Sequence, residues 1–448
     1  MKRIKDIFLR LVVVIMAAWS GLVAQNPLIL DQFTADPSAR VFDGKVYVYP
    51  SHDILCQKGR GIIGFCMPDY HVFSSDDLIN WQDHGVIVSQ TNVPWVDSSA
   101  YSMWAPDCIS RNGKYYFYFP AIAKEKSFGR GMRIGVAISD TPYGLFLPEP
   151  EPIEAVYGID PNPFIDADGQ AYLYWAAHRA LYMAKLKENM IELATDPQEV
   201  TGLPDGFKEG PYLFERKGIY YFTFPYVIRK TEKIAYATGD NPMGPFEYKG
   251  IIMDESPTGC WTNHHSIIEY KDQWYLFYHH NDLSPEFDKN RSIRADSLFF
   301  YDDGTIRKVI PTWRGVGLTD ATGKIQIDRY SAISAKGVRI DFLNERQKNQ
   351  GWKVRLKGAN SWVRYNGVNF GEYRLKTVTI KATSKTGGVI DIRIDKTDGQ
   401  LIARLDIPKT QNWTELSATV TEPPAGIHNL IIDLNNNANV EIDWISFQ

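Results

Sequence analysis

The stretch GIDPNPFIDADGQAYLYW, residues 158–175, decides the fold because its pattern returns elsewhere in the chain. An acid and a proline precede a short apolar run, a DADG turn follows, and an alternating aromatic run comes after the turn. Two strands around a turn of the NG or DG kind are predicted to pair as a β-hairpin. The related stretches are ADPSARVFDGKVYVY (35–49), WAPDCISRNGKYYFYF (104–119), EGPYLFERKGIYYFTF (209–224) and HHSIIEYKDQWYLFYH (264–279).

These five hairpins form an internal repeat with a period of roughly 50 to 70 residues, which is the range of propeller blades. Their turn residues are Gly44, Gly113, Gly169, Gly218 and Asp272. A further alternating run and polar turn fill each period, in segments 72–85, 134–146, 180–193, 234–250 and 292–306. Four strands in each of five periods predict an all-β fold, a five-bladed β-propeller, over residues 25–318.

The repeat stops after PTWRGVGLTDATG (311–323), and a second pattern begins. Residues 324–448 contain short alternating runs such as TVTIKATS, GVIDIRID and HNLIIDL. About eight such strands separated by turns predict a β-sandwich of the jelly-roll kind as a second domain.

The amino terminus has the pattern of a secretory signal peptide over residues 1–24. A basic start (MKRIKDIFLR) precedes an apolar centre (LVVVIMAA) and a small-residue end (GLVAQ). The apolar run is short for a bilayer span, and no second candidate follows. We expect an exported protein, periplasmic or secreted, with no membrane span after signal removal; a retained signal anchor is the alternative.

Charge and cysteine content limit the classes of partner, metal site and disulfide that the chain can have. The formal net charge is −4, and no cluster of Lys and Arg indicates a nucleic-acid partner. The four cysteines show no zinc-ligand spacing. Cys56 and Cys66 flank a Gly-rich loop and are candidates for a disulfide after export, whereas two free buried thiols are as plausible as a bond for the other pair.

Acidic residues recur at one place in the repeat. Asp36, Asp160, Glu209 and His264 each precede the turn of their hairpin by eight or nine residues, and Trp104 or Ala105 holds that place in the second blade. Inner strands line the central axis, so we expect these side chains to converge at one mouth of the propeller. Taken singly, each acid is equally explained as a turn or loop residue.

Three carboxylates in one pocket repel each other and raise the proton affinity of at least one. A protonated acid beside an ionised base is the arrangement that cleaves glycosidic bonds. The rival chemistry is a hard cation held by the acids and His264. Sugar chemistry is favoured by three nearby tryptophans, Trp95, Trp104 and Trp261, although inter-blade packing also explains Trp95.

At this point the motifs resemble glycoside hydrolase family 43, over roughly residues 26–318. They are ADPSA with Asp36, WAPD with Trp104, GIDPNPFID with Asp160, EGPYLF with Glu209 and TNHHS with His264. The resemblance implies a five-bladed propeller that hydrolyses arabinose- and xylose-containing plant polysaccharides with inversion. The WMNDPNG and RDP signatures of the related sucrose-acting propellers are absent.

The same resemblance assigns roles. It implies that Asp36 is the general base, Glu209 the general acid, and Asp160 the residue that tunes the pKa of the acid and positions it. His264 resembles an axial histidine that binds calcium or ordered water, and Arg291 resembles a substrate-pocket arginine, with Arg294 as the neighbouring alternative. Trp104 and Trp261 complete the expected substrate-binding set.

In the second domain, GANSWVRYNGVNFG and VEIDWISF resemble carbohydrate-binding module family 6. Two positions depart from the family pattern: Thr410 replaces a sugar-stacking tryptophan, and Glu441 replaces an asparagine. Trp362 or Tyr365 is then either a sugar contact or a structural residue. Gln326, Asp328 and Asp443 resemble a structural calcium site, and no cofactor is expected for the chemistry itself.

The sequence therefore favours an inverting, exo-acting α-L-arabinofuranosidase on arabinoxylan. A β-xylosidase of the same family is the close alternative. A non-catalytic sugar-binding propeller is the alternative from another class, but it leaves the three confined acids unexplained.

Overall fold

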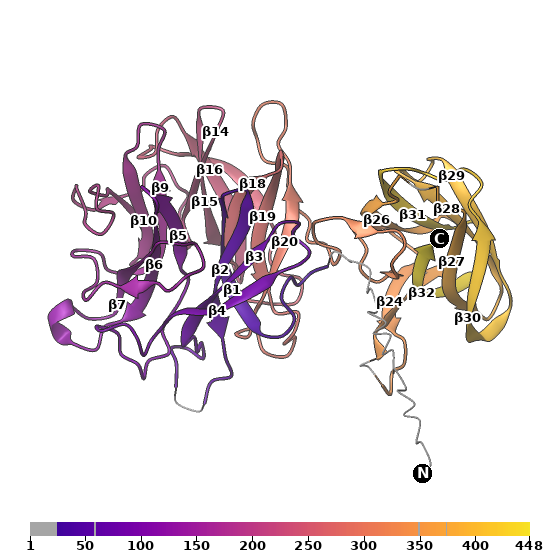
Figure 1. Ribbon diagram of the computed structural model, residues 1–448, viewed down its shortest axis with the longest axis horizontal. Helices are drawn as coiled ribbons and strands as arrows, with labels where there is room; N and C mark the ends of the chain where they lie inside the picture. Colours follow the sequence, from indigo (N-terminus) through magenta and orange to yellow (C-terminus); the bar gives the residue numbers. More distant parts are fainter. Residues whose placement is uncertain (1–24, 58–59, 348–349, 373) are drawn as a thin grey trace, which may run out of the picture.

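The computed structural model describes residues 25–448 except 58–59, 348–349 and 373. The predicted signal peptide therefore lies outside the described residues. Figure 1 shows two bodies side by side, a ring of sheets from the first two thirds of the chain and a sandwich from the last third. Within the described ranges no helix is long and apolar enough to cross a membrane. A short 3-10 helix, Lys126–Phe128, lies between β6 and β7.

Four sheets of the ring run outward from an inner hairpin. The first blade is β1 (Phe33–Phe42), β2 (Lys45–Asp53), β3 (Asp69–Ser75) and β4 (Gln82–Ser89). The second is β5 (Asp107–Arg111), β6 (Lys114–Ile122), β7 (Met132–Ser139) and β8 (Leu147–Pro148). The third is β9 (Ile159–Ile165), β10 (Ala171–Ala177), β11 (Ala180–Lys185) and β12 (Gln198–Glu199). The fourth is β13 (Phe207–Lys208), β14 (Tyr212–Arg216), β15 (Ile219–Val227), β16 (Glu232–Gly239) and β17 (Glu247–Met253).

The fifth blade is β18 (His265–Tyr270), β19 (Gln273–His280) and β20 (Ser292–Leu298). The expectation of four strands is wrong for this blade. Its outer edge is instead bonded by the amino-terminal segment: Leu28 N–H donates to Ile293 O at 2.9 Å, and the Asn26 side chain bonds both backbone groups of Ala295 at 3.0 Å. This pairing joins the beginning of the chain to the last blade.

The hairpin turns form where the sequence indicates them. In four of the five, both central turn residues have positive φ, as at Asn112 (52°) and Gly113 (74°). Such backbone angles fit the right-handed twist of paired strands and favour Gly, Asn and Asp. The predicted NG and DG turns are therefore confirmed.

The inner strands close a ring in which β1 contacts β5 and β18, β9 contacts β5 and β14, and β14 contacts β18. A polar chain links them around the axis. Asn162 on β9 donates to Asp107 on β5 at 2.7 Å and accepts from Leu213 N–H on β14 at 2.9 Å. Ser266 on β18 donates to Pro37 O on β1 at 2.7 Å. This ring holds the strand ends that carry the acids in fixed relative positions.

The second domain is a sandwich of two six-stranded sheets around one apolar core. One sheet contains β21 (Thr319–Asp320), β23 (Ala332–Ile333), β26 (Ser361–Asn369), β28 (Gly388–Ile394), β29 (Leu401–Ile407) and β31 (Ile427–Leu434). The other contains β22 (Ile325–Gln326), β24 (Val338–Phe342), β25 (Trp352–Lys357), β27 (Thr377–Ser384), β30 (Thr410–Thr419) and β32 (Asn439–Phe447). The predicted all-β fold with a propeller followed by a sandwich is confirmed.

Candidate active site

The three predicted acids line one pocket of about 350 Å³. The expected substrate contacts line it too, and the full lining is Asp36, Ile63, Phe65, Met67, Trp104, Ala105, Ile159, Asp160, Phe207, Glu209, Trp261, Thr262, His264 and Arg291. Arg294 does not line it and pairs with Asp282 at 2.5 Å. Trp95 is also absent, because its fully buried ring stacks on Phe119 in the core. Of the two candidate arginines, Arg291 therefore lines the pocket, and Trp95 packs in the core.

Each acid lies at a break in an inner strand. Asp36 (φ 49°) lies where the β1–β2 register shifts, and Asp160 (φ 58°) lies beside the shift in the β9–β10 register. In the fourth blade, Glu209 and the two residues after it separate β13 from β14, and Gly210 has a φ of 50°. A bulge re-aims a side chain that would otherwise follow the strand alternation. Left-handed backbone at non-glycine residues is costly and is typical of functional sites.

Asp36 is buried and surrounded by donors. Arg291 Nη1 donates to its Oδ1 at 2.8 Å, and Ser51 Oγ donates to its Oδ2 at 2.5 Å. Burial alone raises the pKa of Asp36, but the Arg291 charge and the other neighbours outweigh it and lower the pKa to about 2. Asp36 is therefore ionised at neutral pH.

Two residues that the sequence reasoning missed hold this arrangement. Asp53 accepts from Arg291 Nε at 2.9 Å and from its backbone N–H at 2.8 Å, which fixes the guanidinium against Asp36. His279 Nδ1 accepts the Asp36 backbone N–H at 3.0 Å, which stabilises the left-handed backbone. Burial, followed by the Arg291 charge, lowers the pKa of His279 to about 3, so the ring is neutral and keeps that acceptor.

Glu209 and Asp160 have the opposite electrostatics. Burial, and next the Glu232 carboxyl, raise the pKa of Glu209 well above its usual value. Burial and the Glu209 charge likewise raise the pKa of Asp160, although Gly210 N–H donates to its Oδ2 at 2.9 Å. Among the described residues no Lys, Arg or His lies within ion-pair distance of either carboxyl. Burial without a direct ion-pair partner therefore favours the protonated form of both carboxyls.

Glu232 is a further buried acid, at the start of β16, that sequence reasoning missed. Its Oε2 accepts the Asn263 N–H at 2.6 Å, and its Oε1 has no N–H or O–H donor in the described part of the chain. Its carboxyl neighbours that of Glu209, and two carboxyls can hydrogen-bond only when one carries a proton. Burial raises the pKa of Glu232 to about 8. The two carboxyls act on each other's pKa, and we infer that Glu209 and Glu232 share a proton.

Aromatic side chains form the pocket walls. Trp261 is 40% exposed and lies against Phe207, with ring centroids 6.1 Å apart. Trp104 meets Phe65 edge to face at 5.9 Å, and its buried indole N–H has no acceptor among the residues that the structure describes. An apolar face beside an available donor is a surface that suits a sugar ring.

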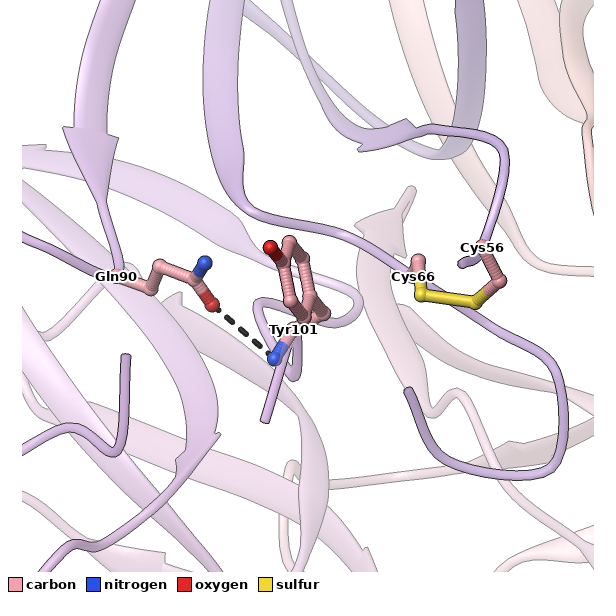
Figure 2. Close-up of a disulfide and its surroundings, with 4 residues drawn as sticks. All are labelled: Cys56, Cys66, Gln90 and Tyr101. Atoms are coloured by element: carbon pink, nitrogen blue, oxygen red, sulfur yellow. Dashed lines mark hydrogen bonds between the residues drawn. A yellow bond between two sulfur atoms is a disulfide. The ribbon is translucent and has the colours of Figure 1, made fainter. Parts of the chain in front are cut away.

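One wall belongs to a loop closed by the predicted Cys56–Cys66 disulfide, which is confirmed (Figure 2). Cys108 and Cys260 are free and buried. Met67 N–H donates to Tyr101 O at 3.0 Å, and Tyr101 N–H donates to Gln90 Oε1 at 3.1 Å. The loop that carries Phe65 is thus fixed to the segment that leads to Trp104.

His264 lines the pocket, and burial lowers its pKa. In the described ranges, neither His264 nor the three acids form a group of three His, Cys, Asp or Glu side chains whose ligand atoms lie close enough to share a metal ion. The rival hard-cation site is therefore not formed by these side chains. A calcium ion at His264 would need water for most of its six to eight ligands.

The expected calcium residues of the sandwich lie on or beside the paired strands β22 and β32. Gln326 pairs with Trp444, and Asp443 O accepts the Ile327 N–H at 3.2 Å. Burial raises the pKa of Asp328, and the neighbouring Asp443 charge contributes. Oxygen ligands of this kind fit calcium, although a salt bridge of 2.8 Å from Lys381 already occupies Asp443.

One departure from the binding-module pattern, Glu441, has a structural explanation. Glu441 pairs with Lys353 at 2.9 Å and with Arg355 at 3.0 Å. Tyr365 is buried in the core beneath Arg314, so it serves structure and not a sugar, whereas Trp362 is half-buried.

Comparisons with known proteins agree with this geometry. The family model described as glycosyl hydrolases family 43 matches residues 24–306, and that of carbohydrate binding module (family 6) matches residues 333–448. A xylosidase/arabinosidase of Bacteroides ovatus is 38% identical over 62% of this chain and 95% of that protein. An arabinoxylan arabinofuranohydrolase of Bacillus subtilis is 26% identical over 90% of this chain and 88% of that protein.

Among solved structures, a family 43 β-xylosidase/α-arabinofuranosidase from a compost microbial metagenome, in complex with xylotriose and in a calcium-free form, superimposes with a TM-score of 0.58. It is 38% identical, and the match covers 64% of this chain and 97% of the other. The chain therefore belongs to glycosyl hydrolase family 43, and it is a glycoside hydrolase with a carboxyl-terminal carbohydrate-binding module of family 6.

Proposed function

We propose that this protein is an inverting, exo-acting α-L-arabinofuranosidase that removes arabinose from arabinoxylan. The observation that carries the proposal is a small pocket lined by Asp36, which Arg291 pairs with, and by Asp160 and Glu209, whose pKa values are raised. Inverting glycosidases use a pair of carboxyls, a base for water and an acid for the leaving oxygen.

In the single displacement step, Asp36 accepts a proton from water as the water oxygen attacks the anomeric carbon. Arg291 and Ser51 keep the carboxylate ionised and oriented. In the same step Glu209 gives its proton to the glycosidic oxygen, which leaves with the shortened chain. Asp160 holds the acid through the Gly210 N–H, and Glu232 shares its proton.

Pocket shape supports exo action. A volume of about 350 Å³ is near the lower end of ligand sites, which run from about 300 to 1,000 Å³. The disulfide-closed loop and the Trp261 side each supply a wall, so a single terminal or branching sugar fits better than a continuous chain. A half-exposed Trp261 offers the stacking surface next to it.

The choice of arabinoxylan draws on relatives that span both domains. Two proteins that cover about nine tenths of this chain, from Paenibacillus polymyxa and Bacillus subtilis, are arabinoxylan arabinofuranohydrolases. A β-xylosidase is the second candidate, since a β-xylosidase of Xylanibacter ruminicola is 35% identical over the propeller.

The test compares aryl α-L-arabinofuranoside, aryl β-D-xyloside and arabinoxylan, with the product anomers followed by NMR. We expect the arabinofuranoside to have the higher kcat/KM, and arabinose to appear first as the inverted anomer. Asp36→Asn and Glu209→Gln should each abolish most turnover with unchanged circular dichroism. A preference for the xyloside would favour the second candidate, and a retained anomer would reject the mechanism.

We also propose that the protein is exported and works outside the cytoplasm. The Cys56–Cys66 bond supports this proposal, because disulfides persist in oxidising compartments. Detection of the oxidised, shortened chain in the periplasm or medium of an expressing cell would test it.

A further inference from the structure

A second group of titratable side chains lies in the first blade, apart from the pocket lining. His52 comes from β2, and Asp69 and His71 come from β3. Their ligand atoms all lie within 4.8 Å of one another. In the part of the chain that the structure describes, no other three His, Cys, Asp or Glu side chains meet in this way.

Strand alternation places the group behind the catalytic base. Ser51 and Tyr70 are paired across β2 and β3 and point to the same face, where Ser51 donates to Asp36. Neighbouring residues along each strand point to the opposite face. His52, Asp69 and His71 therefore share the face that is turned away from the pocket.

The distances within the group suit a tetrahedral ion. His52 Nδ1 lies 2.7 Å from Asp69 Oδ1, and His71 Nε2 lies 3.9 Å from the same oxygen. Ligand atoms bound at about 2.0 to 2.2 Å to a tetrahedral zinc ion are about 3.3 Å apart. Shifts of roughly half an ångström in each of the two His–Asp69 pairs would therefore give them the spacing of zinc ligands.

A carboxylate behind one imidazole orients it. His71 Nδ1 lies 3.0 Å from both oxygens of Asp83, and Asp83 Oδ1 accepts the Gly85 N–H at 2.7 Å. Metal-bound histidines commonly donate their other ring N–H to a carboxylate, which fixes the tautomer and the ring. This contact leaves His71 Nε2, the atom facing Asp69, as the free ligand.

The geometry points to a zinc site formed by His52, Asp69 and His71, with Asp83 orienting His71: we propose that the protein binds one Zn²⁺ there. Two imidazoles and a carboxylate are a ligand set that zinc takes with a fourth position open. The side chains are 16 to 22% exposed, so an ion can enter from solvent and water can fill that position. Bound zinc would clamp β2 to β3 behind Ser51 and Asp53.

Zinc binding is tested on the oxidised mature chain without a histidine tag, by isothermal titration with zinc chloride and by metal analysis after dialysis. We expect one zinc per chain and a higher melting temperature with zinc. His52→Ala and His71→Ala should each weaken binding at least 100-fold. Asp83→Asn keeps all three ligands and should weaken binding about 10- to 100-fold.

His428→Ala is the matched control, because His428 pairs with Asp395 at 3.0 Å without a second histidine. It should leave zinc affinity unchanged. Circular dichroism without metal separates loss of a ligand from loss of fold in every variant. The proposal is overturned if the wild-type chain binds no zinc at 100 times the protein concentration, or if His71→Ala binds as the wild type does. Either result would leave the group as a hydrogen-bonded tie between two strands.

Discussion

The most informative test of the site is Glu232→Gln. The substitution keeps the shape of a buried side chain but replaces a carboxyl that shares a proton with Glu209 by an amide. The amide N–H donates to Glu209 whether or not Glu209 is ionised, and it carries no charge to repel an ionised neighbour. Both changes favour ionised Glu209, so the pKa of the general acid should fall.

The size of the fall follows from the new hydrogen bond. A hydrogen bond to a charged group contributes about 1.5 to 3 kcal/mol, and about 1.4 kcal/mol corresponds to one pKa unit. The basic limb of the kcat/KM profile should therefore move to lower pH by about 1 to 2 units. At pH 5 we expect activity within about threefold of the wild type, and above the shifted limb about 10- to 100-fold less.

The assay is the pH profile of kcat/KM on an arabinose-bearing oligosaccharide. Glu247→Gln, in the same blade but exposed and paired with Lys249, is the matched control and should leave the profile unchanged. A dinitrophenyl glycoside, whose leaving group needs little protonation, should lose much less activity than the oligosaccharide. A basic limb that stays in place or rises, or a loss equal at every pH, would refute the proton-sharing pair.

Stability supplies a second readout with a defined sign. The pKa of Glu232 is about 8 in the folded protein, above its ordinary value of 4.5. A raised pKa contributes stability below the unfolded value that is lost as the pH rises through the folded value. The melting temperature of the propeller should therefore fall between pH 4.5 and 8. The fall should be smaller in Glu232→Gln, and not absent, because the pKa values of Asp160 and Glu209 are raised too.

Three further predictions concern other parts of the structure. Arg291→Lys removes the two guanidinium hydrogen bonds that help to hold the pKa of Asp36 near 2. The acidic limb of the kcat/KM profile should therefore move to higher pH, with a large loss of kcat. An acidic limb that does not move would exclude this role of Arg291. Cys56→Ser together with Cys66→Ser opens a loop with a separation of 10 residues, which should lower the free energy of unfolding by about 3 kcal/mol. The double variant should also raise KM more than it lowers kcat. Denaturant midpoints equal to those of the wild type would contradict the stability prediction. Calcium should raise the melting temperature of the sandwich and chelation should lower it, with Asp443→Asn insensitive to both; a wild-type chain indifferent to calcium would reject the site.

Much of the fold follows from local sequence. Turn residues such as Asn112 and Gly113 and the alternating aromatic runs form hairpins within a few residues of chain, and their repetition predicts the number of blades. The positions of Asp36, Asp160 and Glu209 relative to their turns were enough to predict that they share one pocket. Equivalent residues of a repeat occupy equivalent places in the fold. The repeat did not predict whether Trp95 contacts a sugar or packs in the core, because its stacking on Phe119 depends on how two segments pack.

The residues that set the chemistry of those acids lie outside the repeat position. Asp53, His279 and Glu232 come from second and third strands, and no spacing marks them. Only ring closure brings Asp53 and Asp36 against Arg291 of the last blade, whereas strand pairing within the fourth sheet brings Glu232 near Glu209. Local turn and strand preferences act over a few residues, so the sequence alone determined the blades and the three acids. Burial and charge act through space, so only the tertiary structure decided which acid is ionised and which hold protons.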